Sequence, residues 1–211
     1  MLADKLAVTV YELEHFMQWG TPEDLNEYNY WSNIYKDLVR GQKNNSKHSG
    51  AVLIPMAGLG KRFSDEDYSD PKPFIEVSGK PMVEQAVNML PQAEKYNFVT
   101  RKDLPKIDLI EARIKALYPN SDIITLDGAT DGQARTCLLG MKNIDMEKPL
   151  TIGACDNGAI YDGDAFNKLI NGGNIDVIVW GIRNHPDAVR NPNAFGWIDK
   201  DKDSNNINKV S

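Results

Sequence analysis

The sequence has few cysteines, no long hydrophobic run and no basic tract. Its 211 residues include two cysteines, Cys137 and Cys155, and their separation fits neither a disulfide framework nor a metal-binding motif. The apolar runs are too short to cross a bilayer, and the N-terminus lacks the hydrophobic stretch of a signal peptide. We therefore expect a protein of the reducing cytoplasm that does not engage a membrane.

The charge balance disfavours a nucleic-acid partner. The chain has 24 basic and 30 acidic residues, which gives a formal net charge of −6. Binding to a polyanion depends on clustered lysines and arginines, and no such cluster is present. A small phosphate ligand is still compatible with this charge, because such a site needs few local cations and Mg²⁺ can supply further positive charge.

Strand and helix patterns alternate from Ala51 onward. The whole chain has 41% hydrophobic and 26% charged residues, which is ordinary for a globular protein. Such alternation predicts a Rossmann-like, doubly wound and mostly parallel α/β sheet. The strands are expected at 51–56, 96–100, 122–126, 149–154 and 175–181, and the helices at 81–90, 107–117, 132–141 and 164–170.

The first 40 residues form a segment of their own. A strand is expected at 6–13, and Thr21 and Pro22 have the N-cap and first-turn preferences of a helix that runs to about Leu38. The apolar residues of this helix recur at helical spacing and are expected to pack in a core; they are Leu25, Tyr28, Trp31, Tyr35 and Leu38. Residues 41–50 are polar and glycine-flanked, which indicates a linker in which His48 is solvated.

The most informative stretch begins at the strand 51–56. A glycine turn follows, Ala57-Gly58-Leu59-Gly60, then Lys61 and Arg62, and later Pro71-Lys72-Pro73. A glycine turn after a buried strand lets backbone N–H groups approach a phosphate, and the cations can bind its oxygens. A Rossmann fingerprint requires a glycine where Phe63 stands, and a P-loop requires Ser or Thr where Arg62 stands, so neither motif matches. The plain alternative is a solvated turn with surface cations.

The compound pattern resembles the signature of the sugar-phosphate nucleotidyltransferases, which include NDP-sugar pyrophosphorylase-like and MobA-like proteins. The matching residues occur in the family's order: Gly58, Gly60, Arg62, Phe63, Pro71, Lys72, Pro73, Gly79, Lys80, Pro81 and Met82. Residues 15–38 also resemble the C-terminal end of the same family. The resemblance implies a GT-A-like domain at 51–211, incomplete at its C-terminal end, preceded by a tail at 1–40 and a linker at 41–50. The tail could end a tandem domain or pack onto its own head.

The resemblance also implies roles for individual residues. Arg62 and Lys72 would be catalytic, and Asp156 would hold Mg²⁺. The nucleotide would contact Ala57, Gly58, Leu59, Gly60, Lys61, Gly132 and Gln133, and Gly196 would lie on the sugar side. Structural alternatives remain for three of these positions: Asp156 as a turn residue, Gly132–Gln133 as a helix start capped by Thr130 or Asp131, and Gly196 as an edge-strand glycine.

The activity implied by the resemblance is transfer of NMP from a nucleoside triphosphate to a sugar 1-phosphate, with release of pyrophosphate, in activated-sugar and surface polysaccharide synthesis. Choline phosphate or a molybdopterin is a weaker alternative as acceptor. The partners would then be a nucleoside triphosphate and a phosphorylated small molecule, and a homo-oligomer or tandem domain is left open. The second hypothesis is a nucleotide-binding domain without catalysis that serves regulation or assembly.

Overall fold

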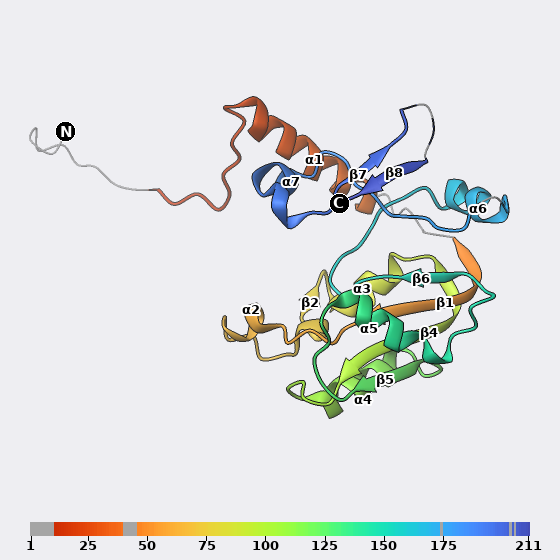
Figure 1. The fold of residues 1–211 in the computed structure, drawn as a ribbon. Helices are drawn as coiled ribbons and strands as arrows, with labels where there is room; N and C mark the ends of the chain where they lie inside the picture. The colour runs from red at the N-terminus through yellow and green to blue at the C-terminus, as the bar shows by residue number, and fades with distance from the viewer. Residues whose placement is uncertain (1–10, 40–45, 174, 203, 205) are drawn as a thin grey trace, which may run out of the picture. The chain divides into compact units, whose positions relative to one another are not determined.

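The computed structural model describes residues 11–39, 46–173, 175–202, 204 and 206–211. The chain forms two compact units (Figure 1). One spans residues 42–176, and the other combines residues 1–41 with 177–211. In this grouping, residues 177–211 fall with the N-terminal segment and not with the sheet, and the predicted division at 1–40, 41–50 and 51–211 stays a prediction.

The unit at 42–176 is built on a four-stranded sheet, in the order β5 (Asp122–Leu126), β4 (Gln92–Arg101), β1 (Lys47–Pro55) and β6 (Leu150–Ile152). All three pairings are parallel. The strands are rich in Val, Ile and Leu because both faces of the sheet are covered. The predicted α/β class with a parallel sheet is confirmed.

Helices cover both faces of the sheet. On one face α3 (Met82–Asn88) and α4 (Ile107–Leu117) pack over β1 and β4, and their shared core includes Val52, Ile54, Phe98, Val83 and Ile114. On the other face α5 (Gln133–Gly140) places Cys137 against Leu53 and Val99. The connection from β5 to β6 passes through α5 and returns to the far side of β1. Successive strands are thus added first on one side of β1 and then, with β6, on its other side. In such sheets this switch between β1 and β6 opens a crevice at the carboxyl ends of the strands.

Short elements complete this unit. They are α2 (Lys61–Ser64), η2 (Lys72–Phe74), β2 (Glu76–Val77), β3 (Lys80–Pro81), η3 (Met141–Asn143) and α6 (Gly163–Asn171). β2 and β3 pair as an antiparallel hairpin whose turn contains Gly79 in the left-handed region, at φ 80°. None of the described helices combines the length and apolar character that a bilayer span requires.

The polar stretch before Ala51 is partly strand, so the linker prediction is wrong for residues 47–50. β1 begins at Lys47, because Lys47 and His48 pair with Gln92 and Ala93 of β4. His48 is 7% exposed, in contrast to the solvated residue expected. Its Nε2 lies 3.0 Å from Oγ1 of Thr151, and its Nδ1 accepts a 3.2 Å hydrogen bond from the Gly50 amide. Residues 41–45 of the expected linker lie outside the described residues.

The other unit contains α1 (Pro22–Val39), α7 (Pro186–Arg190), η4 (Pro192–Ala194) and the antiparallel pair β7 (Ile198–Lys200) and β8 (Ile207–Val210). The helix predicted from Pro22 is confirmed, and Thr21 Oγ1 accepts from the Asp24 amide at 3.1 Å. The prediction that its apolar stripe packs in a core is wrong. No residue of α1 is buried, and Leu25, Tyr28, Tyr35 and Leu38 are exposed.

Two predicted strands have no counterpart among the residues that the structure describes. The first covers residues 6–13, of which 6–10 lie outside the described residues and 11–13 belong to no strand. The second, at 175–181, has the β-branched composition of a strand, yet its residues form no strand and Val177 is 76% exposed. A strand needs a partner to satisfy its backbone groups, and composition alone does not supply one.

Candidate active site

A pocket of about 480 Å³ lies at the carboxyl ends of the sheet strands. Its walls come from the segments that follow β1, β4, β5 and β6 and from η2, so separate stretches of the sequence meet there. The lining residues are Pro55, Met56, Ala57, Gly58, Gly60, Lys72, Pro73, Arg101, Ala129, Thr130, Gly132, Gln133, Thr136, Ala154, Cys155, Asp156 and Asn157. This is the position at which doubly wound sheets bind ligands.

The glycine turn forms the wall after β1. Gly60 is the N-cap of α2 and has φ 64°, a left-handed conformation that a side chain disfavours. A Cβ at Gly60 would also lie 3.0 Å from the Cβ of Lys72. A Cβ at Gly58 would meet no protein atom within 4 Å, so the backbone there faces open pocket. The turn therefore presents bare backbone to the pocket.

Lys72 and Asp156 both line the pocket and form an ion pair through Nζ and Oδ2. Lys72 opens η2, and the next two residues, Pro73 and Phe74, are buried. Phe74 belongs to the main core, and this burial fixes the backbone that carries Lys72. The side chains of Lys72 and Asp156 are 27% and 37% exposed, so both charges remain accessible to a ligand.

The loop after β5 forms the opposite wall. α5 begins with Gly132 as its N-cap, and no side chain bonds to its first amides. Thr130 Oγ1 instead donates to the Gly132 carbonyl at 3.0 Å. The interpretation in which Thr130 or Asp131 caps the helix is therefore not supported. The first-turn N–H groups of α5, together with the exposed Gln133 side chain, remain available to a ligand.

The donor set at Asp156 bears on a metal. Within the described part of the chain, no group of three or more His, Cys, Asp or Glu side chains could enclose an ion. Mg²⁺ commonly binds one or two carboxylates and completes its coordination with water and substrate phosphates. Asp156, which lines the pocket together with Asn157, fits a Mg²⁺ ion held jointly with a phosphate ligand.

Cys155 lines the same pocket but is not suited to nucleophilic chemistry. It is 9% exposed, and burial, with the adjacent Asp156 carboxylate adding to the effect, raises the pKa of its thiol to about 11. The reactive form of cysteine is the thiolate, so a thiol with this pKa is inert at neutral pH. The pocket also offers the charges of Lys72 and Asp156 and the bare backbone of the glycine turn.

The structure brings most of the predicted site residues together. Ala57, Gly58, Gly60, Lys72, Gly132, Gln133 and Asp156 all line the pocket. Arg62, Leu59 and Lys61 do not line it, and all three are exposed. Gly196 belongs to the other unit, between η4 and β7, and its sugar-side role stays a prediction.

Arg101 lines the pocket and was missed by the sequence reasoning. It is the last residue of β4 and is 7% exposed. The predicted strand ended at Thr100, and Arg101 belongs to none of the motifs. A cation at the end of a buried strand was the signal that could have revealed it, because the carboxyl ends of parallel strands share one edge.

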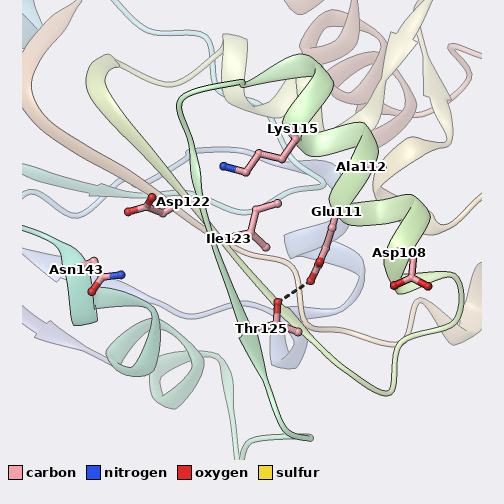
Figure 2. A pocket seen from close by; sticks show the side chains of 8 residues that line it. All are labelled: Asp108, Glu111, Ala112, Lys115, Asp122, Ile123, Thr125 and Asn143. Carbon is pink, nitrogen blue, oxygen red and sulfur yellow. Dashed lines mark hydrogen bonds between the residues drawn. The ribbon is translucent and has the colours of Figure 1, made fainter.

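A second depression, of about 550 Å³, lies along β5 between α4 and η3 (Figure 2). Three of its charged side chains are engaged with the protein. Thr125 donates to Glu111 at 2.6 Å, and Lys115 donates to the Ser121 carbonyl. Asp122 lies 2.8 Å from the ammonium of Lys95. These pairings leave a solvated surface, and the smaller pocket is the better candidate site.

No protein-family model and no curated protein sequence matches the chain. Solved structures that resemble part of it include the following two. One is a nucleoside-diphosphate-sugar pyrophosphorylase from Vibrio cholerae RC9, at 24% identity and a TM-score of 0.40 over 55% of this chain and 52% of that one. The other is an inositol-1-phosphate CTP transferase from T. maritima, at 20% identity and a TM-score of 0.43 over 51% and 44%.

The chain thus matches about half the length of these two proteins. Both names belong to the class that the sequence motif resembles. Likeness at this level does not carry a function from one protein to another.

Proposed function

We propose that this protein is a nucleotidyltransferase that transfers NMP from a nucleoside triphosphate to a phosphorylated small molecule. The observation that carries the proposal is the convergence of a bare glycine turn, Lys72 and Asp156 in one pocket at the switch point of the sheet. The turn supplies N–H donors, Lys72 a positive charge and Asp156 a carboxylate. A reaction between phosphates requires this combination of groups.

In the proposed reaction an oxygen of the acceptor phosphate attacks the α-phosphorus of the triphosphate. The new bond joins that oxygen to the α-phosphorus of the NMP group. The bond between the α-phosphorus and the oxygen that bridges to the β-phosphate breaks, and pyrophosphate leaves with the electron pair. The acceptor oxygen is already anionic, so no general base is needed. The protein's contribution is in-line positioning and neutralisation of negative charge.

Each wall of the pocket has a role in this scheme. The Gly58 and Gly60 backbone binds the triphosphate, and Gln133 offers a donor and an acceptor to the base edge. Lys72 leaves Asp156 and neutralises charge at the reacting phosphates. Mg²⁺ would be held by Asp156 and would supply Lewis-acid neutralisation of the phosphate oxygens. Arg62, exposed on α2, would reach the phosphates from outside the pocket lining.

A sugar 1-phosphate is the acceptor that we favour, on the sequence resemblance, with activated-sugar and polysaccharide synthesis as the setting. The test is pyrophosphate release in the presence of Mg²⁺, with each of the four common ribonucleoside triphosphates against a panel of sugar 1-phosphates and choline phosphate. Release with one pair of substrates would establish the reaction and identify both.

The decisive variant is Lys72→Ala, which we expect to lower turnover at least about 100-fold, because a charge-assisted contact to the reacting phosphates is removed. Lys80→Ala is the matched control. Lys80 belongs to the same motif, but it pairs with Glu84 at 2.7 Å on the surface and does not line the pocket. Equal rates in both variants would refute the assignment of Lys72. Nucleotide-dependent thermal stabilisation without pyrophosphate release would favour the binding-only alternative.

A further inference from the structure

Arg101 is a buried cation at the floor of the pocket. It ends β4, and β4 lies between β1 and β5 in the sheet. The carboxyl end of β4 is held on both sides, since Met56 donates to the Val99 carbonyl and Lys102 donates to the Leu126 carbonyl. Arg101 is therefore placed between the glycine turn after β1 and the loop after β5, which are the two walls assigned to the phosphates and the base.

The guanidinium of Arg101 is poorly satisfied by the protein. It carries a permanent charge and five N–H donors. Its Nε lies 2.8 Å from Oδ1 of Asp103, but this buried Nε makes no directed hydrogen bond. The Asp103 side chain is 56% exposed, so it is a partly solvated counter-ion. Burial of a cation is costly unless it is well paired, and a single off-axis carboxylate pairs it weakly.

A purely structural role does not account for this side chain. The turn after β4 is closed by backbone, with the Leu104 amide donating to the Arg101 carbonyl at 3.3 Å. The exposed cation next to it behaves differently: Lys102 pairs with Asp127 at 2.5 Å, with both side chains in solvent. Arg101 alone of the two faces the pocket, where its fork can bind a phosphate group through two parallel hydrogen bonds.

We infer that Arg101 binds a phosphate of the nucleotide in this pocket, and that Asp103 holds the guanidinium in the free protein and releases it when the phosphate binds. The inference rests on the proposed function for the identity of the ligand as a nucleotide. It assigns Arg101 as a binding residue and Asp103 as the anion with which the ligand competes.

Isothermal titration calorimetry of the full chain tests this inference without any turnover. The probes are inorganic tripolyphosphate and the four ribonucleosides, at fixed ionic strength. We expect Arg101→Gln to weaken tripolyphosphate binding about 10- to 100-fold, which corresponds to the loss of a charged hydrogen bond. Binding of a nucleoside, where the wild type shows it, should be unchanged, because a nucleoside lacks the phosphate.

The second variant, Asp103→Asn, does not depend on the folding of a protein altered at a buried position. We expect it to tighten tripolyphosphate binding about two- to fivefold, the range that corresponds to a partly exposed ion pair. Asp127→Asn removes the same charge from the neighbouring exposed pair and is the matched control, with a smaller effect expected.

The outcomes separate the inference from the proposed function. Weaker or unchanged binding in Asp103→Asn, or a gain no larger than in Asp127→Asn, would overturn the inference, and so would a wild-type chain that does not bind tripolyphosphate. Equal loss of nucleoside and tripolyphosphate binding in a folded Arg101→Gln variant would assign Arg101 to the base and overturn it as well. The expected binding results without pyrophosphate release would uphold the phosphate site and refute the transferase.

Discussion

A methyl group added to each glycine of the turn after β1 should affect a different property: protein stability at Gly60 and ligand binding at Gly58. Gly60 has φ 64°, and its Cβ would press against the Cβ of Lys72 at 3.0 Å. Gly58 faces the open pocket, and a methyl group added there would have no protein atom within 4 Å. Gly60→Ala is therefore a test of stability, and Gly58→Ala is a test of ligand approach.

The expected changes in stability and affinity follow from the backbone conformation of each glycine and from the free space around its Cα. For Gly60→Ala the left-handed conformation destabilises the folded state by about 1–2 kcal/mol. The lower conformational entropy of the unfolded chain offsets about 0.4–1 kcal/mol of this loss. We expect a net destabilisation of about 1 kcal/mol, or a few degrees in Tm. For Gly58→Ala we expect a change in stability within about 0.5 kcal/mol. Its methyl group would occupy the approach of a phosphate and remove about one charged hydrogen bond, which is about 10- to 100-fold in Kd.

The assay combines thermal unfolding with calorimetric titration of the nucleoside triphosphate that binds the wild type best. Gly58→Ala should unfold at the wild-type temperature and bind the triphosphate more weakly. Gly60→Ala should unfold at a lower temperature. A Gly58→Ala variant with wild-type stability and wild-type affinity would show that the turn is not a phosphate site, and the function proposed from it would lose its main support.

Two further predictions concern a metal and a buried histidine. Asp156→Asn should raise the Mg²⁺ concentration for half-maximal pyrophosphate release at least about 10-fold, since an amide is a poorer Mg²⁺ ligand than a carboxylate. An unchanged Mg²⁺ titration would favour the alternative in which Asp156 is only a turn residue. Burial lowers the pKa of His48 below its ordinary value of 6.5. The unfolded chain therefore binds a proton first as pH falls through 6.5, and stability should decrease below that pH. His48→Gln should reduce this dependence in denaturant unfolding at pH 5 and 8, and an unchanged dependence in this variant would contradict the assignment to His48.

Local sequence patterns predicted the sheet domain well where a short segment sets its own structure. The helix at 107–117 and the strand at 122–126 were predicted with the bounds that the structure gives. Both have an apolar pattern that matches the period of the element and polar or turn residues at each end. The convergence of the glycine turn and Asp156 was also predictable, because each follows a strand of a parallel sheet, whereas Lys72, which opens η2, was placed there by its motif.

The errors arose where pairing or packing, rather than local pattern, decides the structure. Residues 175–181 have strand composition but form no strand. His48 lies in a polar stretch but is buried, because β4 extends far enough to pair with it and Thr151 of β6 supplies a hydrogen-bond partner. The stripe on α1 has core periodicity but is exposed. Periodicity shows that a face is apolar, but it does not show what covers that face.

Charge pairing in the pocket explains how an acidic chain can offer a phosphate site. Lys72 pairs with Asp156, and Arg101 with Asp103, so these four side chains carry no net charge in the free protein. Each cation is therefore held in place at the pocket without the repulsion that two unpaired cations would create. In the proposed reaction an entering phosphate would displace a carboxylate from a cation, and the displaced Asp156 would become available to a metal. The formal net charge of −6 is thus no obstacle to the proposed function, because the proposed site would act by exchanging ion-pair partners instead of accumulating positive charge.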